Sequence, residues 1–446
     1  MIAIPQAEIL DIVPRLQEAV HAVNTRPVKG RVKRIIGNLV HAMVPDARLG
    51  EVCALRDIHS DVTSYAEIVG FDDTVAMLSP LGQLQGLSTS TEVSTTGRFL
   101  DVPVGNALLG RVLDGFGNPL DASEKGKLPD MQRRPLVNNA PPALSRRIIE
   151  RPLCLGLRAV DGLLTCGEGQ RIGIYGEPGT GKSLLLGQIL RTSEADINVI
   201  ALVGERGREV REFIERQLSP ESRARSVVVV ATSDRSSVER VKGAQTAMTI
   251  AEHFRDQGAR VLLVVDSVTR LARALREIGL AAGEPPTRRG FPPSVFTVLP
   301  ALFERAGMAT EGSITAFFTV LVEGDGTADP VAEETRGLLD GHIILSPKLV
   351  RAGHFPAIDV PASLSRVMID VVNRDHLGTA QKVRQLISKH AEVEFLIQVG
   401  EYQPGGDKLA DEAIAKWPAI LQFLRQSSRE RSDFSQTLRL MRTLAA

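Results

Sequence analysis

Short apolar runs separated by glycine, proline and aspartate fill the first quarter of the chain. Residues 31–36, 51–55 and 65–71 are β-like runs of this kind. Regular strand spacing with turn residues between the runs is typical of a small barrel. The pattern therefore predicts a β-barrel over residues 29–104.

The centre of the chain alternates nearly continuous apolar runs with amphipathic segments. The runs with strand character are 171–175, 198–203, 226–231, 260–265 and 314–320. Strands that are apolar on both faces suit a parallel sheet with helices on both sides. We predict an α/β domain over residues 150–370. Residues 371–446 are mostly helical in pattern and predict a small C-terminal helical domain.

Two further segments flank the predicted barrel. Residues 105–149 are rich in proline and glycine, which indicates a linker between domains. Residues 1–28 include apolar positions with helical spacing between 6 and 24. This stripe either docks on a partner or a membrane surface or packs on its own domain, and the pattern leaves both interpretations open.

A phosphate-binding pattern follows the first strand of the α/β region. Residues 176–183 read Gly-Glu-Pro-Gly-Thr-Gly-Lys-Ser, and the apolar residues 184–190 that follow fit a helix. Glycines let successive backbone N–H groups converge on phosphate oxygens, and a helix N-terminus adds its positive dipole. Lys182 is expected at the β- and γ-phosphates and Ser183 at Mg²⁺. The predicted nucleotide-binding residues in this loop are Gly176, Gly179, Thr180, Gly181, Lys182, Ser183 and Leu184.

A strand-end carboxylate is the expected second anchor for magnesium. Residues 261–265 are five apolar residues, and Asp266 follows them directly. An acidic residue at the carboxyl end of a parallel strand faces the crevice in which ligands bind. Asp266 is therefore predicted on the Mg²⁺ side, acting through water. Capping of the helix that starts near Ser267 is the alternative, and both roles are compatible.

A second carboxylate follows the second strand of the predicted sheet, 198–203. Glu205 follows the apolar residues 201–203 with Gly204 between them, and it is our candidate for polarising the attacking water. Glu209, one helical turn later, is a candidate for holding a water of the Mg²⁺ shell. The alternative is a salt-bridged helix start with Arg206 and Arg208 solvated, and spacing alone leaves the two interpretations equal.

Composition narrows the class of protein. The 446 residues include 53 Lys+Arg and 53 Asp+Glu, a balance that does not favour a strongly basic nucleic-acid binder. Three cysteines without C-x-x-C spacing predict neither a disulfide framework nor a zinc site; Cys53, Cys154 and Cys166 fit small buried apolar residues in a reducing cytoplasm. The sequence shows neither a bilayer-length apolar run nor a signal-peptide pattern, so we expect a soluble cytosolic protein.

Longer motifs resemble a known family. Residues 204–206, Gly-Glu-Arg, resemble the catalytic-glutamate motif of rotary-type ATPases. Residues 266–290, 321–325 and 339–346 are similar to the signatures of the secretion ATPases, which include the flagellar export ATPase and its type III secretion relatives. The resemblance runs from about residue 30 to about residue 425. Within the family, Leu-Thr-Cys-Gly-Glu-Gly-Gln-Arg at 164–171 looks more like the injectisome branch.

The resemblance assigns roles at matching positions. Glu205 matches the catalytic carboxylate and Arg206 an arginine that helps to organise the site, while Asp266 matches the strand-end acid. Phe355 takes the place of an aromatic residue that stacks on adenine, where many members carry tyrosine. Arg366 matches the arginine finger, which acts in the neighbouring subunit's site.

The same resemblance implies an architecture, cofactors and partners. It implies a RecA-like phosphate-loop core, ATP and Mg²⁺ as cofactors, and a homo-hexameric ring as the active form. The implied partners are chaperone–effector complexes and the central stalk and stator of an export apparatus, at the cytoplasmic face of the inner membrane and without nucleic acid. Residues 324–330 and Ser346-Pro347 depart from the usual family pattern without removing a catalytic group.

Three alternatives compete with protein export. A rotary ATP synthase catalytic subunit fits the site chemistry, but the chain lacks its long acidic C-terminal lever and has at 401–407 a segment similar to secretion members. A hexameric RNA translocase carries base-stacking aromatics on its barrel, where this chain has only Tyr65, Phe71 and Phe99. A catalytically inactive ring subunit typically replaces the catalytic acid, and here Glu205 is present.

Overall fold

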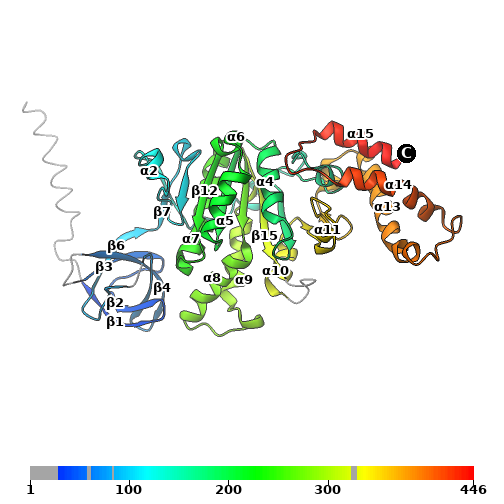
Figure 1. Ribbon diagram of the computed structural model, residues 1–446. Helices are drawn as coiled ribbons and strands as arrows, with labels where there is room; N and C mark the ends of the chain where they lie inside the picture. Colours follow the sequence, from blue (N-terminus) through cyan, green and yellow to red (C-terminus); the bar gives the residue numbers. More distant parts are fainter. Residues whose placement is uncertain (1–28, 58–61, 83–84, 323–328) are drawn as a thin grey trace, which may run out of the picture. The chain divides into compact units, whose positions relative to one another are not determined.

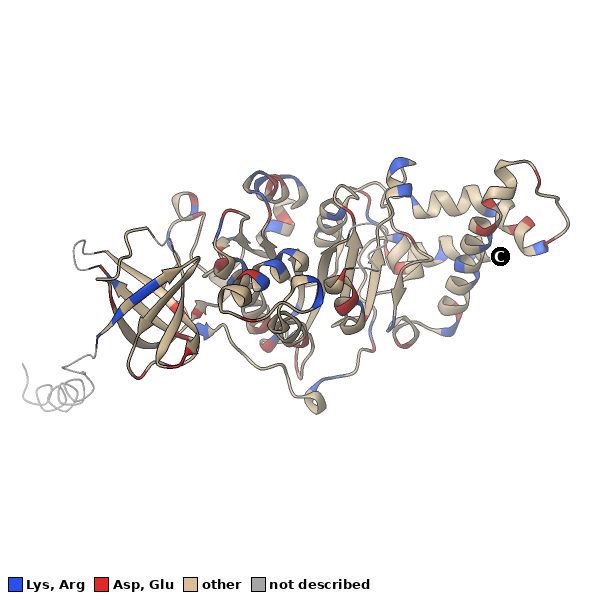
Figure 2. Cartoon of the chain, turned by 90° about the horizontal axis from the view of Figure 1, so that it is seen from below, with Lys and Arg blue, Asp and Glu red and all other residues tan. Residues whose placement is uncertain are grey.

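The chain divides into two compact units, residues up to Leu100 and Asp101–Ala446. The computed structural model (Figure 1) describes residues 29–57, 62–82, 85–322 and 329–446. The predicted stripe at 6–24 and most of the loop at 324–330 lie outside the described residues. Where the chain is described, charged residues of both signs are spread along it rather than gathered on one element (Figure 2).

The first unit confirms the predicted barrel. Among its described residues, six antiparallel strands close in the order β1-β2-β5-β4-β3-β6. Their bounds are β1 Gly30–Ile36, β2 Leu39–Met43, β3 Glu51–Arg56, β4 Thr63–Asp72, β5 Val75–Pro80 and β6 Glu92–Phe99. Alternate side chains such as Val40, Leu55 and Leu78 fill the interior because successive residues of a strand face opposite sides.

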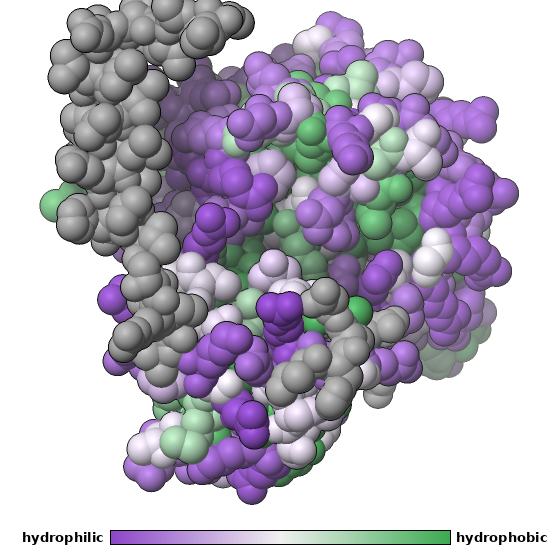
Figure 3. All heavy atoms as spheres, turned by 90° about the vertical axis from the view of Figure 1, so that its left-hand side faces the viewer, coloured by the Kyte–Doolittle hydropathy of each residue, from purple (hydrophilic) through white to green (hydrophobic). Residues whose placement is uncertain are grey.

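The outer surface of the barrel retains some large apolar side chains. Tyr65, Phe71 and Phe99, the aromatic residues that the RNA-translocase alternative needs, are all exposed. On the face drawn in Figure 3, hydrophilic residues predominate and apolar residues lie between them. Scattered apolar side chains are ordinary for a protein surface and by themselves do not indicate a binding face.

The second unit is built on one large, mainly parallel sheet. The order of its described strands is β17-β16-β10-β15-β13-β11-β12-β8, with β14 antiparallel to β15 and β17 antiparallel to β16. The five strands predicted from sequence are β10 Arg171–Gly176, β11 Ile197–Val203, β12 Ser226–Ala231, β13 Arg260–Asp266 and β15 Ser313–Leu321, so all five are confirmed. The others are β8 Val112–Asp114, β14 Gly307–Met308, β16 Gly341–Ile344 and β17 Leu364–Ser365.

The segment predicted as a linker contributes structure to this unit. Strand β8 lies inside residues 105–149 and pairs in parallel with β12 at the sheet edge. Strand β9 Arg133–Pro135, also inside this segment, pairs antiparallel with β7 Asp101–Pro103, which lies just before the segment. The limits at 28, 104, 149 and 370 remain predictions.

Helices cover both faces of the sheet. Along β11, Ile200 and Leu202 pack into one apolar cluster, and Val199, Ala201 and Val203 into the other. One face carries α7 Ser237–Asp256, α8 Val268–Ala281, α9 Pro293–Glu304 and α10 Pro330–Leu338; the other carries α3 Arg158–Leu163, α4 Lys182–Thr192 and α5 Gly207–Glu212. Shorter helices are α2 Ala122–Lys125, α6 Pro220–Ala224, α11 Pro347–Arg351 and α12 Met368–Val371.

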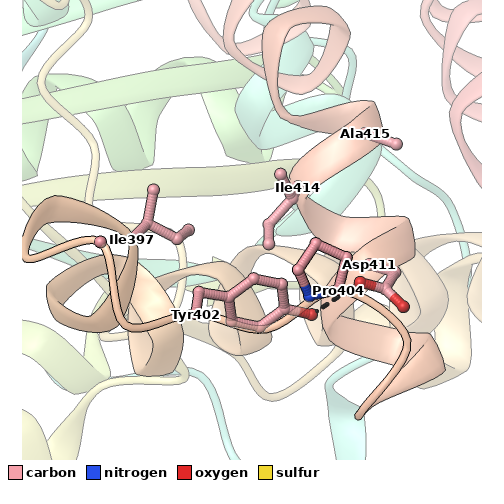
Figure 4. A pocket seen from close by; sticks show the side chains of 7 residues that line it. Ile397, Tyr402, Pro404, Asp411, Ile414 and Ala415 are labelled. Carbon is pink, nitrogen blue, oxygen red and sulfur yellow. Dashed lines mark hydrogen bonds between the residues drawn. The ribbon is translucent and has the colours of Figure 1, made fainter.

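The C-terminal region is helical, as predicted. Helices α13 Arg374–Gln398, α14 Lys408–Leu424 and α15 Phe434–Ala445 pack on one another and on α3 (Figure 1). Between the end of α13 and the start of α14 lies a cavity of about 340 Å³ (Figure 4). There the Tyr402 hydroxyl donates a hydrogen bond of 2.8 Å to Asp411. The three cysteines are free and buried, as their spacing predicts.

A buried ion pair joins α7 to the end of α9. The Arg305 guanidinium donates to both carboxylate oxygens of Glu252 at 2.8 Å each, and to Thr249 and the Leu136 carbonyl at 2.9 Å. Neither charged side chain is more than 5 % exposed. Such a pair is costly to break because the remaining charge stays buried without its partner.

Replacing Glu252 with glutamine is therefore expected to lower the free energy of unfolding by about 3–5 kcal/mol. Urea denaturation followed by far-UV circular dichroism measures the change. Glu215→Gln is the matched control, because its partner Arg211 is 81 % exposed and such surface pairs contribute less than about 1 kcal/mol. Equal changes in the free energy of unfolding would show that the buried pair stabilises the fold no more than an exposed pair does.

Candidate active site

The phosphate loop lies between β10 and α4, as predicted. Gly179 and Gly181 adopt φ values of +82° and +89°, in the left-handed region that glycine reaches without strain. A Cβ atom at Gly176 would come within 2.6 Å of the Thr180 hydroxyl. That hydroxyl donates to the Glu177 carbonyl at 2.7 Å. The loop therefore depends on glycine at these positions, just before the helix N-terminus that attracts anions.

Lys182 lies buried at the start of α4. Its ammonium donates hydrogen bonds of 2.7 Å to the carbonyls of Gly176 and Glu177, which hold it beside the loop. Burial lowers the pKa of Lys182 to about 8, and the nearby carboxylates of Asp266 and Glu205 oppose that shift. The next residue, Ser183, is exposed at the first turn of the helix.

Glu205 follows β11, which is two strands from β15 and three strands from β10 in the sheet order. Its carboxylate lies 2.8 Å from the guanidinium of Arg270. Burial, then the charge of Asp266 and a hydrogen bond with Glu209, raise the pKa of Glu205 to about 8. The same hydrogen bond lowers the pKa of Glu209. A carboxylate whose pKa is raised towards neutrality suits the exchange of a proton with water.

Gly204 allows the Arg270 side chain to approach the end of β11 closely. Its φ is +71°, and a Cβ atom there would lie 2.9 Å from the Arg270 side chain. The Arg270 guanidinium also donates to the Gly204 carbonyl. Arg270 therefore fixes both the backbone and the carboxylate at the end of β11.

Asp266 ends β13 with only 6 % of its surface exposed. The Thr319 hydroxyl on the neighbouring strand β15 donates to its carboxylate at 2.6 Å. Burial raises the pKa of Asp266, whereas this hydrogen bond and the charge of Lys182 lower it. Helix α8 is capped instead by Ser267, whose hydroxyl accepts from the Arg270 N–H, so the capping interpretation of Asp266 is wrong.

Arg206 and Glu209 lie at the rim of this group. Arg206 is exposed, and its guanidinium is 3.8 Å from the Glu209 carboxylate. Arg208 is exposed to solvent as well. The salt-bridged helix start considered from spacing is thus present, yet Glu209 also hydrogen-bonds Glu205. The two interpretations of this segment coexist.

A cavity of about 250 Å³ extends from the phosphate loop along α4. Phe355 lines it with 42 % of its surface exposed. The other lining residues are Thr180, Gly181, Leu184, Leu185, Gln188, Leu345, Pro356, Ala357, Gln426, Ser427 and Ser428. An exposed aromatic ring beside a phosphate loop is suited to stack on a nucleobase.

Arg366 is placed away from its own phosphate loop. It follows β17, which runs antiparallel to β16, and its backbone N–H donates to the Asp340 carbonyl at 2.9 Å. Asp340 immediately precedes β16, which is parallel to β10. Arg366 therefore lies near the strand starts, whereas the phosphate loop follows the carboxyl end of β10. Its exposed guanidinium donates only to the Arg336 carbonyl, at 3.2 Å, among the described residues.

Comparison with known proteins identifies the family. Residues 156–365 match the nucleotide-binding domain of the ATP synthase alpha/beta family, 32–97 its β-barrel domain, and 372–443 the C-terminal domain of the type III secretion ATPase EscN. The Type 3 secretion system ATPase of Sinorhizobium fredii is 56% identical over 95% of this chain and 94% of its own length. The chain belongs to the type III secretion ATPases of the ATP synthase alpha/beta family.

Other relatives agree with this assignment. The SPI-2 type 3 secretion system ATPase of Salmonella typhimurium is 50% identical over 90% of this chain and 91% of its own. The flagellum-specific ATP synthase of Bacillus subtilis is 46% identical over 93% and 94%. A solved structure of assembled EscN from enteropathogenic E. coli superposes with a TM-score of 0.89, at 46% identity, covering 94% of this chain and all of that one. The predicted secretion ATPase is thus confirmed as an enzyme that hydrolyses ATP.

No described helix is long and apolar enough to cross a membrane.

The sequence interpretation of this secretion ATPase missed several residues at the site. Arg270 lies inside the 266–290 signature, so that motif was the signal for it. Gln188 is a polar residue within the apolar run 184–190, which is a weaker signal. Thr319 and Gln426 gave none, because they reach the site from distant segments.

The residues expected at magnesium have suitable chemistry. Among the described residues, no three His, Cys, Asp or Glu side chains gather as a self-sufficient metal site. Mg²⁺ usually needs only one or two protein oxygens, with water and phosphate completing its shell. The exposed hydroxyl of Ser183 and the strand-end carboxylate of Asp266 fit that requirement.

Proposed function

We propose that this chain is a ring-forming ATPase that hydrolyses Mg·ATP to energise protein export through a type III secretion apparatus. The observation that carries the proposal is the division of the site within one chain. Lys182, Glu205 and Asp266 gather at the carboxyl ends of neighbouring strands, whereas Arg366 lies near the opposite strand ends. Such a site is completed by a neighbouring copy.

Each residue has a distinct task in the proposed reaction. The loop N–H groups and Lys182 bind the phosphates, and Glu205 orients the attacking water and accepts its proton. Ser183 would hold Mg²⁺ directly, with Asp266 and Glu209 acting through water; the bound ion supplies charge neutralisation. Arg206, at the rim, organises the outer side of Glu205. Phe355 stacks on the base.

A homo-hexamer is the proposed active form. Arg366 can serve a phosphate group only in another subunit, because its own loop lies at the other end of the sheet. The relative EscN is known as an assembled ATPase and in complex with its central stalk EscO. The EscN–EscO structure superposes on this chain with a TM-score of 0.86 at 45% identity.

Export partners are proposed at the C-terminal helices. Phe395, Ile397 and Val399 are exposed at or just after the end of α13, and Ile397 also lines the cavity in Figure 4. Exposed apolar side chains gathered at one helix end suit a protein partner. We propose that the partners are the central stalk, stator proteins and chaperone–effector complexes, and that nucleic acid is not among them. The chain would act at the cytoplasmic face of the inner membrane, where it would release chaperones and unfold substrates.

Isolation of the chain from its native cell tests this proposal. A tagged full-length chain is expected to retain secretion-apparatus proteins after affinity purification. Recovery of stator and membrane-ring subunits of ATP synthase would instead identify a rotary synthase subunit, and flagellar components a flagellar export ATPase. Stimulation of ATP hydrolysis by added RNA would contradict the exclusion of nucleic acid.

Lys182→Ala is expected to lower ATP turnover at least about a hundredfold, because the β- and γ-phosphates lose their buried cation. Phosphate release measures turnover, and a fluorescent ATP analogue measures binding. Lys348→Ala is the matched control, since Lys348 is 77 % exposed and pairs with Glu394. Wild-type turnover by Lys182→Ala would remove the phosphate loop from the mechanism.

A further inference from the structure

One side chain that lines the cavity of about 250 Å³ beside the phosphate loop, here called the base cavity, has a polar atom without a hydrogen-bond partner among the described residues. Gln188 lies on α4, one turn after Leu184, and only 2 % of its surface is exposed. It lines the same cavity as Phe355 and Leu184. A polar side chain so deeply buried normally has its hydrogen bonds satisfied.

The orientation of the Gln188 amide is fixed by its donors. Its Nε2 donates to the carbonyls of Ser427 at 3.2 Å and Glu430 at 3.1 Å. A carbonyl can only accept, so the amide cannot be reversed without losing both bonds. Its Oε1 accepts no hydrogen bond from the described residues and is not sealed from solvent. An acceptor of fixed orientation thus belongs to a residue that lines the cavity.

The other polar side chains around the cavity do not share this property. Gln426 accepts from the Arg158 N–H at 2.9 Å and donates to the Gly156 carbonyl at 2.7 Å, so both ends are occupied. The hydroxyls of Ser427 and Ser428 rotate and can donate or accept. Among the described lining side chains, Gln188 alone offers an unoccupied group that can only accept.

We propose that Gln188 determines nucleobase specificity by accepting a hydrogen bond from the exocyclic amino group of adenine. Guanine carries a keto oxygen at that position, which would face Oε1 as a second acceptor. A site built to bind a donor rejects an analogue that lacks it, because its own buried group is left unpaired. The assignment rests on the proposed ATP hydrolysis. It identifies the exocyclic amino group as the part of the base that this chain recognises.

The test compares three substrates with three full-length proteins. The substrates are Mg·ATP, Mg·GTP and the triphosphate of purine riboside, which lacks the 6-amino group. Wild type is expected to show a kcat/KM for ATP about tenfold or more above the other two. In Gln188→Met, kcat/KM for ATP falls by about that factor while the other two change little, so the preference disappears.

Arg191→Met is the matched control. Arg191 lies on the same helix and also holds the 427–430 segment, donating to the Ser428 carbonyl at 2.7 Å, but it does not line the cavity. It is expected to leave the ATP-to-GTP ratio unchanged, even where absolute rates fall. If Gln188 had a purely structural role, kcat/KM would fall together for all three substrates in both variants.

The outcomes separate this assignment from the function on which it rests. Equal kcat/KM for ATP and purine riboside triphosphate in wild type would overturn the assignment while leaving ATP hydrolysis intact. So would a Gln188→Met protein that keeps the wild-type ratio. Failure of wild type to hydrolyse any of the three would refute the proposed function itself. The wild-type comparison needs no variant, so a folding defect in Gln188→Met does not remove the test.

Discussion

Replacing Arg366 with alanine is expected to lower ATP turnover of the assembled protein by about 10³-fold or more, with nucleotide binding unchanged. An arginine that meets the transferring phosphoryl group is worth about 10³–10⁵ in rate. Arg366 is exposed and lies near the strand starts, so it contributes nothing to binding in its own chain. Phosphate release and a fluorescent ATP analogue measure the two quantities separately.

Mixing two inactive variants tests whether Arg366 acts in a neighbouring subunit. Lys182→Ala retains Arg366, and Arg366→Ala retains the phosphate loop. Rings assembled from both contain some interfaces with an intact loop and an intact arginine, so turnover is expected to reappear on mixing. Arg374→Ala is the control for a general loss of positive charge, because Arg374 lies eight residues further along the chain, at the start of α13. If mixed rings stay inactive while assembling normally, Arg366 does not complete a neighbour's site.

Replacing Glu205 with glutamine is expected to preserve ATP binding and lower turnover by about 10²–10⁴-fold. The amide has nearly the same shape, but it cannot take a proton from water. The loop and Lys182 stay intact because Thr180 and Lys182 donate to the carbonyls of Gly176 and Glu177 and not to the Glu205 side chain. Single-turnover hydrolysis with the variant in excess over ATP measures the chemical step directly.

Glu212→Gln is the matched control for Glu205. Glu212 lies on α5 at the same end of the sheet, and its side chain pairs with the exposed Arg216. Its turnover is expected to remain that of wild type. Full activity in Glu205→Gln would remove this carboxylate from the mechanism and leave Glu209 or Asp266 as the group that orients water.

Several elements of this fold could be predicted from sequence because local chemistry specifies them. The strands 171–175, 198–203 and 260–265 are apolar on both faces, and only a covered parallel sheet satisfies such runs. The phosphate loop needs glycine at positions of positive φ, so its residue types reveal its shape. Asp266 and Glu205 were found because each follows a strand that ends at the same edge of the sheet.

Other features of the fold and of the site could not be predicted from the sequence. The segment 105–149 has the composition of a linker, yet β8 within it completes the sheet edge, since pairing with β12 depends on backbone groups rather than on composition. Asp266 was a plausible helix cap until the structure showed the Ser267 hydroxyl in that place. Thr319 contacts Asp266 only because β15 and β13 are neighbours in the sheet.

The sequence by itself determined that the chain has a nucleotide-binding domain, where its phosphate loop lies, and to which family it belongs. These properties rest on residue types at short spacings, and short spacings survive in any fold that forms the strand, loop and helix. The tertiary structure decided what surrounds them. It paired Glu205 with Arg270 and brought Gln188 and residues 426–428 together in the lining of the cavity beside the phosphate loop. Such contacts join residues far apart in sequence, so their geometry exists only after the sheet and the C-terminal helices have packed.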